Sequence, residues 1–218
     1  MQLDNPPYWR PTSEDASFHA SSLLQHDQDS YSKVKSFYEK NGFVIIKSLI
    51  SEDKINNVIS DLNKFFVHAE FLSKKSVNQP ASFEDLIISI FKSDPIVRKN
   101  LYQFSQKLCS LRNCFNSIAV IRVVDYLMGS NVLLSRNHSL RFDIPGENYS
   151  QPLHIDVNSM LSLNAVNAWA PLHNIDADTG GICILPGSHL NGPIDYTRKT
   201  DNGYGTFEDE IILKYKQT

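Results

Sequence analysis

A histidine and an aspartate stand two positions apart in the segment Pro152-Leu153-His154-Ile155-Asp156. The surrounding apolar residues predict a strand over residues 153–157, in which side chains i and i+2 point to the same face. An imidazole nitrogen beside a carboxylate oxygen supplies two of the three protein ligands of a non-haem iron(II) facial triad. The same spacing also suits a hydrogen-bonded histidine at a strand end, so the rest of the sequence must decide between the two interpretations.

The elements that would position this pair change in character at Gly129. After it, short apolar and β-branched runs alternate with glycine, proline and asparagine, a pattern typical of strands and loops. Before it, apolar residues recur at helical spacing. Helices first and strands later predict an α+β domain, with a helical layer against a β-sandwich or barrel. The expected strands are residues 131–134, 139–144, 153–157, 163–169 and 182–185.

Several helix boundaries carry local signals. Gly42 is expected to end the first helix, and a short strand over residues 43–46 follows it. Ser51 and Ser82 are expected to cap two later helices, and Asp94-Pro95 opens another whose inward face runs from Val97 to Leu111. The expected helices are residues 30–41, 51–66, 83–91, 95–111 and 118–128.

The composition favours one soluble domain. The 218 residues, 41% of them hydrophobic, can bury one sizeable core. A net charge of -3 offers no general attraction to nucleic acid or to an anionic membrane, so a small-molecule substrate is the expected partner. No signal peptide or apolar run of about 20 residues is found, and Cys109, Cys114 and Cys183 lack zinc-type spacing. We expect a cytoplasmic protein, with a flexible polar arm over residues 1–29 and one domain over residues 30–218.

Short motifs on both sides of the His154/Asp156 pair resemble those of the phytanoyl-CoA dioxygenase (PhyH) family. They follow in that family's order and roughly in its spacing, and they cover most of residues 30–192. The first of them is similar to the family's opening helix and strand. The motifs are residues 37–47, 153–156, 168–172, 180–181 and 185–189.

The resemblance implies a double-stranded β-helix (a jelly-roll, cupin-like fold) with an N-terminal helical layer. It also implies Fe(II) as the metal and 2-oxoglutarate as cosubstrate. The first two metal ligands would be His154 and Asp156. Trp169 would lie on a strand beside 2-oxoglutarate and pack against it, with ordinary core packing as the alternative. The family does not assign the turn around His189 to the metal, and its Pro-Gly-Ser sequence predicts a structural role.

Polar residues elsewhere leave alternatives open. Arg141 and Asp143 would share one strand face, where they either form a salt bridge or line a substrate channel. His138 is expected to be exposed in a loop, and His173 to lie at a strand end.

The sequence departs from the family after this turn. There the family has a second metal histidine, and then an arginine that binds the distal carboxylate of 2-oxoglutarate. Here only His173 and His189 follow the pair, neither in the right place, and Arg198 lies in a polar segment. The C-terminal strands of the barrel are also expected to be missing, so the domain over residues 30–218 is expected to be incomplete. A truncated oxygenase, a divergent enzyme that uses His173 or His189, and an inactive family member all remain open.

The predicted function is an Fe(II)/2-oxoglutarate-dependent dioxygenase that hydroxylates a small organic substrate. Asp156 favours hydroxylation, because halogenating relatives carry a small residue at that position. Weak or no turnover is expected of these 218 residues, because the second histidine and the arginine are not found. The alternatives are a truncated or inactive β-helix domain that acts as a binding or scaffold protein, and a zinc-type metalloenzyme such as a cupin-like isomerase.

Overall fold

The chain forms two compact units in a computed structural model. Unit 1 consists of Met1–Leu49, Val123–Val132 and Asn148–Thr218, and unit 2 of Ile50–Arg122 and Leu133–Glu147. The structure describes residues 17–24, 28–73, 82–93, 95–129, 133, 138–144, 154–156, 164–175, 181–192, 198–199 and 205–206.

Unit 1 begins with a parallel strand pair and two helices. Phe18 lies opposite Ile46 in this pair. Gly42 ends the helix predicted over residues 30–41, because it adopts the left-handed conformation (φ 78°) and donates its N–H to the carbonyl of Tyr38 at 2.7 Å. The elements are β1 (Ser17–His19), α1 (Ala20–Leu24), α2 (Gln28–Asn41) and β2 (Ile45–Lys47).

The core of unit 1 joins these elements to the second half of α7 (Ile118–Met128). Leu23 and Val34 are each 1% exposed, and they form one cluster with Tyr31, Val123 and Leu127. Burying one such side chain contributes about 1.5–3 kcal/mol. The expected flexible arm is therefore wrong for residues 17–24, which pack into this core; residues 1–16 lie outside the described part of the chain.

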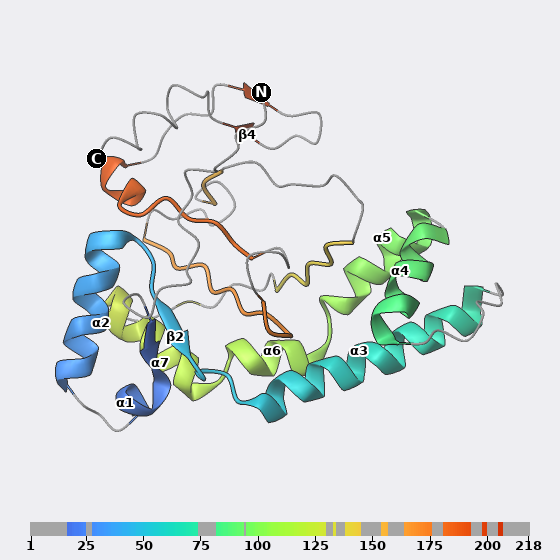
Figure 1. Cartoon of the computed structure of the whole chain (residues 1–218), viewed down its shortest axis with the longest axis horizontal. Helices are drawn as coiled ribbons and strands as arrows, with labels where there is room; N and C mark the ends of the chain where they lie inside the picture. The colour runs from blue at the N-terminus through green and yellow to red at the C-terminus, as the bar shows by residue number, and fades with distance from the viewer. Residues whose placement is uncertain are drawn as a thin grey trace. The chain divides into compact units, whose positions relative to one another are not determined.

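Unit 2 is built around the long helix α3 (Glu52–Ser73). One face of this helix is fully buried, since Val58, Leu62 and Phe66 are all 0% exposed. The ring of Phe66 lies 5.6 Å from that of Phe142, which ties residues 138–144 to the helical layer. The helix packs against α4 (Phe83–Ser93), α5 (Pro95–Ser105) and α6 (Cys109–Phe115) (Figure 1).

The predicted starts of two of these helices, with the Ser82 cap at one of them, are confirmed. The hydroxyl of Ser82 accepts the N–H of Asp85 at 3.1 Å, and α5 begins at Pro95. The single helix predicted over residues 95–111 is wrong, because Leu108 takes an extended conformation (φ −63°, ψ 126°) between α5 and α6. This break changes which residues face inward: Phe104 is 52% exposed, whereas Leu111 is 3% exposed.

Strand pairing is sparse in the described part of the chain. Besides β1 and β2, it contains the antiparallel pair β3 (Arg198–Lys199) and β4 (Gly205–Thr206). The described residues of the predicted strands 139–144, 153–157 and 163–169 belong to no strand, while Ile184 forms a single bridge; of residues 131–134 only Leu133 is described. The double-stranded β-helix is therefore not confirmed.

Residues 138–144 nevertheless keep the burial pattern of a half-buried strand. Leu140 and Ile144 are buried, and the intervening Arg141 and Asp143 are exposed. This alternation with period two is the pattern that predicted a strand here.

The three cysteines are free. Cys109 and Cys183 are exposed, whereas Cys114 is buried in α6. Burial raises the pKa of the Cys114 thiol, and the positive charge of Lys54 offsets part of that shift. Across the residues that the structure describes, no helix combines the length and apolar character needed to cross a membrane.

Candidate metal centre

The structure brings His154 and Asp156 together as predicted. Nε2 of His154 lies 3.3 Å from Oδ1 of Asp156, and the two side chains are 27% and 40% exposed. No strand creates this geometry, because Asp156 stands in a turn. A turn, and not the strand predicted from the two-residue spacing, therefore places the two donor atoms on the same side.

A third residue, Asn167, contacts this pair and was not identified from the sequence. Its side-chain Nδ2 donates a hydrogen bond to Oδ2 of Asp156 at 2.6 Å. A signal was available: Asn167 is a polar residue within an apolar run, two positions before Trp169, so an extended backbone would place both side chains on one face.

The hydrogen bonds lower the pKa of the Asp156 carboxyl. The hydrogen bond from His154 is the largest cause that lowers the pKa of Asp156 from its ordinary value, and the hydrogen bond from Asn167 adds to it. Partial burial acts in the opposite direction and is outweighed. Asp156 is thus charged at neutral pH, the state in which a carboxylate binds a metal.

The donor set of this pair fits Fe(II), since imidazole nitrogen and carboxylate oxygen are the ligand types of the non-haem iron site. His154 and Asp156 supply two such donors at one place. Within the described ranges, no group of three His, Cys, Asp or Glu side chains is suited to hold a metal. A third protein ligand is therefore not assigned.

His189 has a structural position, as its turn sequence predicts. Its Nε2 lies 2.8 Å from the carbonyl oxygen of Glu39, and Gly187 donates its N–H to the carbonyl of Asn41 at 2.9 Å. These contacts satisfy carbonyl groups at the end of α2 that have no partner within the helix. A Cβ added at Gly42 would overlap the imidazole, reaching 2.9 Å from its Cγ. We call this contact of His189 with the end of α2 the His189 clamp.

His173 and His138 have surroundings of their own. His173 is exposed in a bend, and none of the described residues around it forms a strand. The ring of His138 lies 6.2 Å from that of Phe115 and the residue is partly buried, so its expected exposure is wrong.

Two further predictions concern Trp169 and the Arg141 pair. Trp169 is 47% exposed, so it is not an ordinary core residue in this structure. Arg141 and Asp143 form a salt bridge, with Nε 2.8 Å from Oδ1 and 3.1 Å from Oδ2. Of the two alternatives for that pair, the salt bridge is the one observed.

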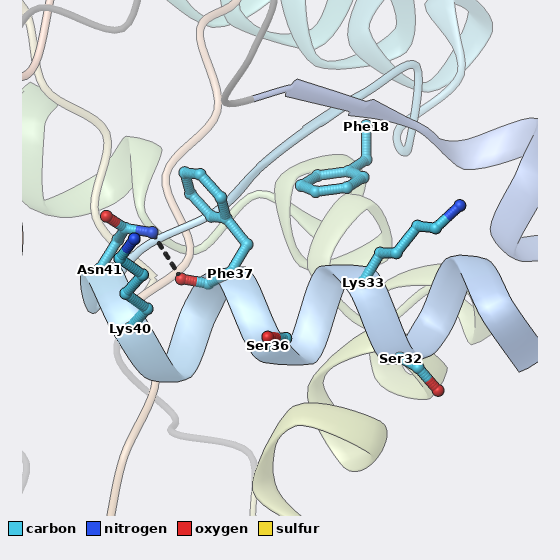
Figure 2. A pocket seen from close by; sticks show the side chains of 7 residues that line it. All are labelled: Phe18, Ser32, Lys33, Ser36, Phe37, Lys40 and Asn41. Atoms are coloured by element: carbon cyan, nitrogen blue, oxygen red, sulfur yellow. Dashed lines mark hydrogen bonds between the residues drawn. The ribbon is translucent and has the colours of Figure 1, made fainter.

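Two depressions are lined by residues other than the candidate ligands. One, of about 690 Å³, runs along α2 beside Phe18, and Figure 2 shows Lys33 and Lys40 on its helix together with the hydrogen bond from Asn41 to the carbonyl of Phe37. Another, of about 280 Å³, lies between α3 and α6 and has a polar lining that includes Lys54 and Asp61. His154, Asp156 and Trp169 line neither depression.

Sequence comparison finds relatives for most of the chain. The family described as "Phytanoyl-CoA dioxygenase (PhyH)" matches residues 38–218. The peroxisomal phytanoyl-CoA dioxygenase of Rattus norvegicus is 29% identical over 172 residues, which are 73% of this chain and 47% of the rat protein. The enzyme of Mus musculus is 26% identical over 75% of this chain and 49% of its own length. That of Bos taurus is 26% identical over 82% of this chain and 54% of its own length.

The chain spans about half the length of the curated relatives it matches. No solved structure matches it. The expectation that this chain shares the fold of its relatives therefore rests on the family match alone.

Proposed function

Because the chain belongs to the phytanoyl-CoA dioxygenase (PhyH) family, we propose that it carries part of the active site of an Fe(II)/2-oxoglutarate-dependent dioxygenase. The single observation that supports this most is the convergence of His154 Nε2 and Asp156 Oδ1 at 3.3 Å. The proposal includes a double-stranded β-helix as the fold of the complete domain.

The roles follow from the chemistry of each side chain. The bound metal would supply the activation of oxygen, coupled to oxidation of 2-oxoglutarate. His154 offers one imidazole nitrogen, and Asp156 offers a carboxylate oxygen whose pKa is lowered by its hydrogen bonds. Trp169, about half exposed, offers an indole face for packing against 2-oxoglutarate.

The proposed substrate is a small organic molecule, and the proposed reaction is hydroxylation. The relatives are named for phytanoyl-CoA, which makes branched acyl-CoA thioesters one class to test. We propose no nucleic acid or membrane partner, since the net charge of -3 provides no attraction to either. The relatives' names also say peroxisomal, so the predicted cytoplasmic location is to be compared with a peroxisomal one by imaging a fluorescent fusion of the chain.

Succinate release from 2-oxoglutarate tests the proposal. The chain is incubated anaerobically with Fe(II), then with oxygen, 2-oxoglutarate and a panel of small organic acids and thioesters. His154→Ala is the test variant, and His68→Ala is its control because His68 is exposed on α3 and is no candidate ligand. Release that disappears in His154→Ala and persists in His68→Ala supports the proposal. A folded chain that binds no divalent metal and releases no succinate would instead support the scaffold alternative.

A further inference from the structure

We propose that Asn167 is a positioning residue that holds the metal carboxylate of Asp156 in its binding orientation. This inference rests on the proposed function. The amide Nδ2 of Asn167 donates to Oδ2 of Asp156 at 2.6 Å, shorter than the about 2.9–3.0 Å usual for an N–H···O hydrogen bond. We do not propose Asn167 as a metal ligand, because its amide N–H donates a hydrogen bond and does not bind a cation.

The two oxygens of Asp156 consequently have different roles. Oδ2 faces the amide of Asn167, while Oδ1 faces Nε2 of His154 at 3.3 Å. The terminal torsion of an aspartate is broad, so the carboxylate of an unrestrained Asp156 would rotate. With Oδ2 held, Asp156 presents one oxygen beside one imidazole nitrogen, and coordination positions stay open for other ligands.

An amide suits this position better than a charged donor. A neutral donor adds no positive charge that would repel a divalent cation beside the carboxylate. Hydrogen-bonded outer partners of this kind orient metal ligands, and their loss typically lowers metal affinity about 10- to 100-fold. Asn167 also lies two positions before Trp169, so one segment carries both the carboxylate's partner and the indole proposed for 2-oxoglutarate.

Metal binding by the whole 218-residue chain tests this role without any turnover. Calorimetry measures the Kd of Mn(II), a redox-stable substitute for Fe(II), for the unmodified chain and its variants. Asn167→Ala removes the amide, and Asn167→Leu removes it at similar volume. The matched control is Asn174→Ala, an exposed asparagine in the same described segment. We expect about a 10- to 100-fold rise in Kd for both Asn167 variants and no change for the control.

Two measurements separate positioning from a general loss of structure. The first is the visible d–d absorption of bound Co(II), which should change in the Asn167 variants because the carboxylate geometry changes. The second is the thermal unfolding midpoint without metal, which should match that of Asn174→Ala. An unchanged Co(II) spectrum together with a lowered midpoint would assign Asn167 a structural role and overturn the inference.

The outcomes also distinguish this inference from the proposed function. Wild-type Mn(II) affinity in both Asn167 variants, with binding lost in His154→Ala and Asp156→Ala, would overturn the inference and leave the proposed function standing. No Mn(II) binding by the unmodified chain, or binding that persists in His154→Ala and Asp156→Ala, would overturn both.

Discussion

Gly42 and His189 lie far apart in the sequence but close together in the structure. We therefore expect substitutions at these two positions to be energetically coupled. Gly42 has φ 78°, and a Cβ built there would overlap the imidazole of His189. Alanine in the left-handed region costs about 1–2 kcal/mol. Forcing a methyl group into a packed neighbour adds about 1–3 kcal/mol. Gly42→Ala should therefore lower the free energy of unfolding by about 2–5 kcal/mol.

Removing the imidazole should remove the steric part of that cost. His189→Ala by itself loses the hydrogen bond to Glu39, which is worth about 0.5–1.5 kcal/mol. In the His189→Ala background, Gly42→Ala should then cost only the about 1–2 kcal/mol of its backbone conformation. The two substitutions are thus expected to be coupled by about 1–3 kcal/mol, with the double variant more stable than the sum of the single effects implies.

Urea denaturation of the two single variants and the double variant measures this coupling as a double-mutant cycle. Gly129→Ala is the matched control, because Gly129 has φ 74° and a Cβ there meets nothing within 4 Å. It should cost about 1–2 kcal/mol whether or not His189 is present. Equal costs of Gly42→Ala in the two backgrounds would refute the steric reasoning.

Three further predictions concern packing, thiol chemistry and a surface ion pair. Phe66→Ala should cost about 3–5 kcal/mol in urea denaturation, because Phe66 is 0% exposed, while the 52% exposed Val67→Ala should cost far less. The buried Cys114, whose folded pKa is raised, should be alkylated by iodoacetamide much more slowly than the exposed Cys109 and Cys183, as mass spectrometry of the intact native chain would show. Its thiol contributes stability that is complete below its unfolded pKa and is lost as the pH rises through the raised folded pKa, so Cys114→Ala should flatten the fall of unfolding free energy at alkaline pH. Equal alkylation rates would contradict this account of Cys114. Arg141→Ala should change the unfolding free energy by at most about 1 kcal/mol, because the salt bridge to Asp143 is solvent-exposed, and a larger loss would mean that Arg141 has another structural role.

The sequence by itself determined several helix boundaries and the family. Gly42, Ser82, Pro95 and Gly129 mark helix boundaries in the structure as they do in the sequence, because caps and left-handed glycines act on backbone groups within a few residues. The candidate ligands His154 and Asp156 could also be identified from the sequence, because their spacing is short and the surrounding motifs identify the family.

Only the tertiary structure decided how distant segments meet. The break at Leu108 leaves Phe104 52% exposed, although a pattern continuous over residues 95–111 places it on the inward face. The imidazole of His189 reaches a carbonyl 150 residues earlier in the chain, and the amide of Asn167 reaches Asp156 across 11 residues. Hydrogen bonds of this kind depend on the packing of whole segments, for which local propensity carries no signal. The candidate site therefore gained its third member, Asn167, from the fold.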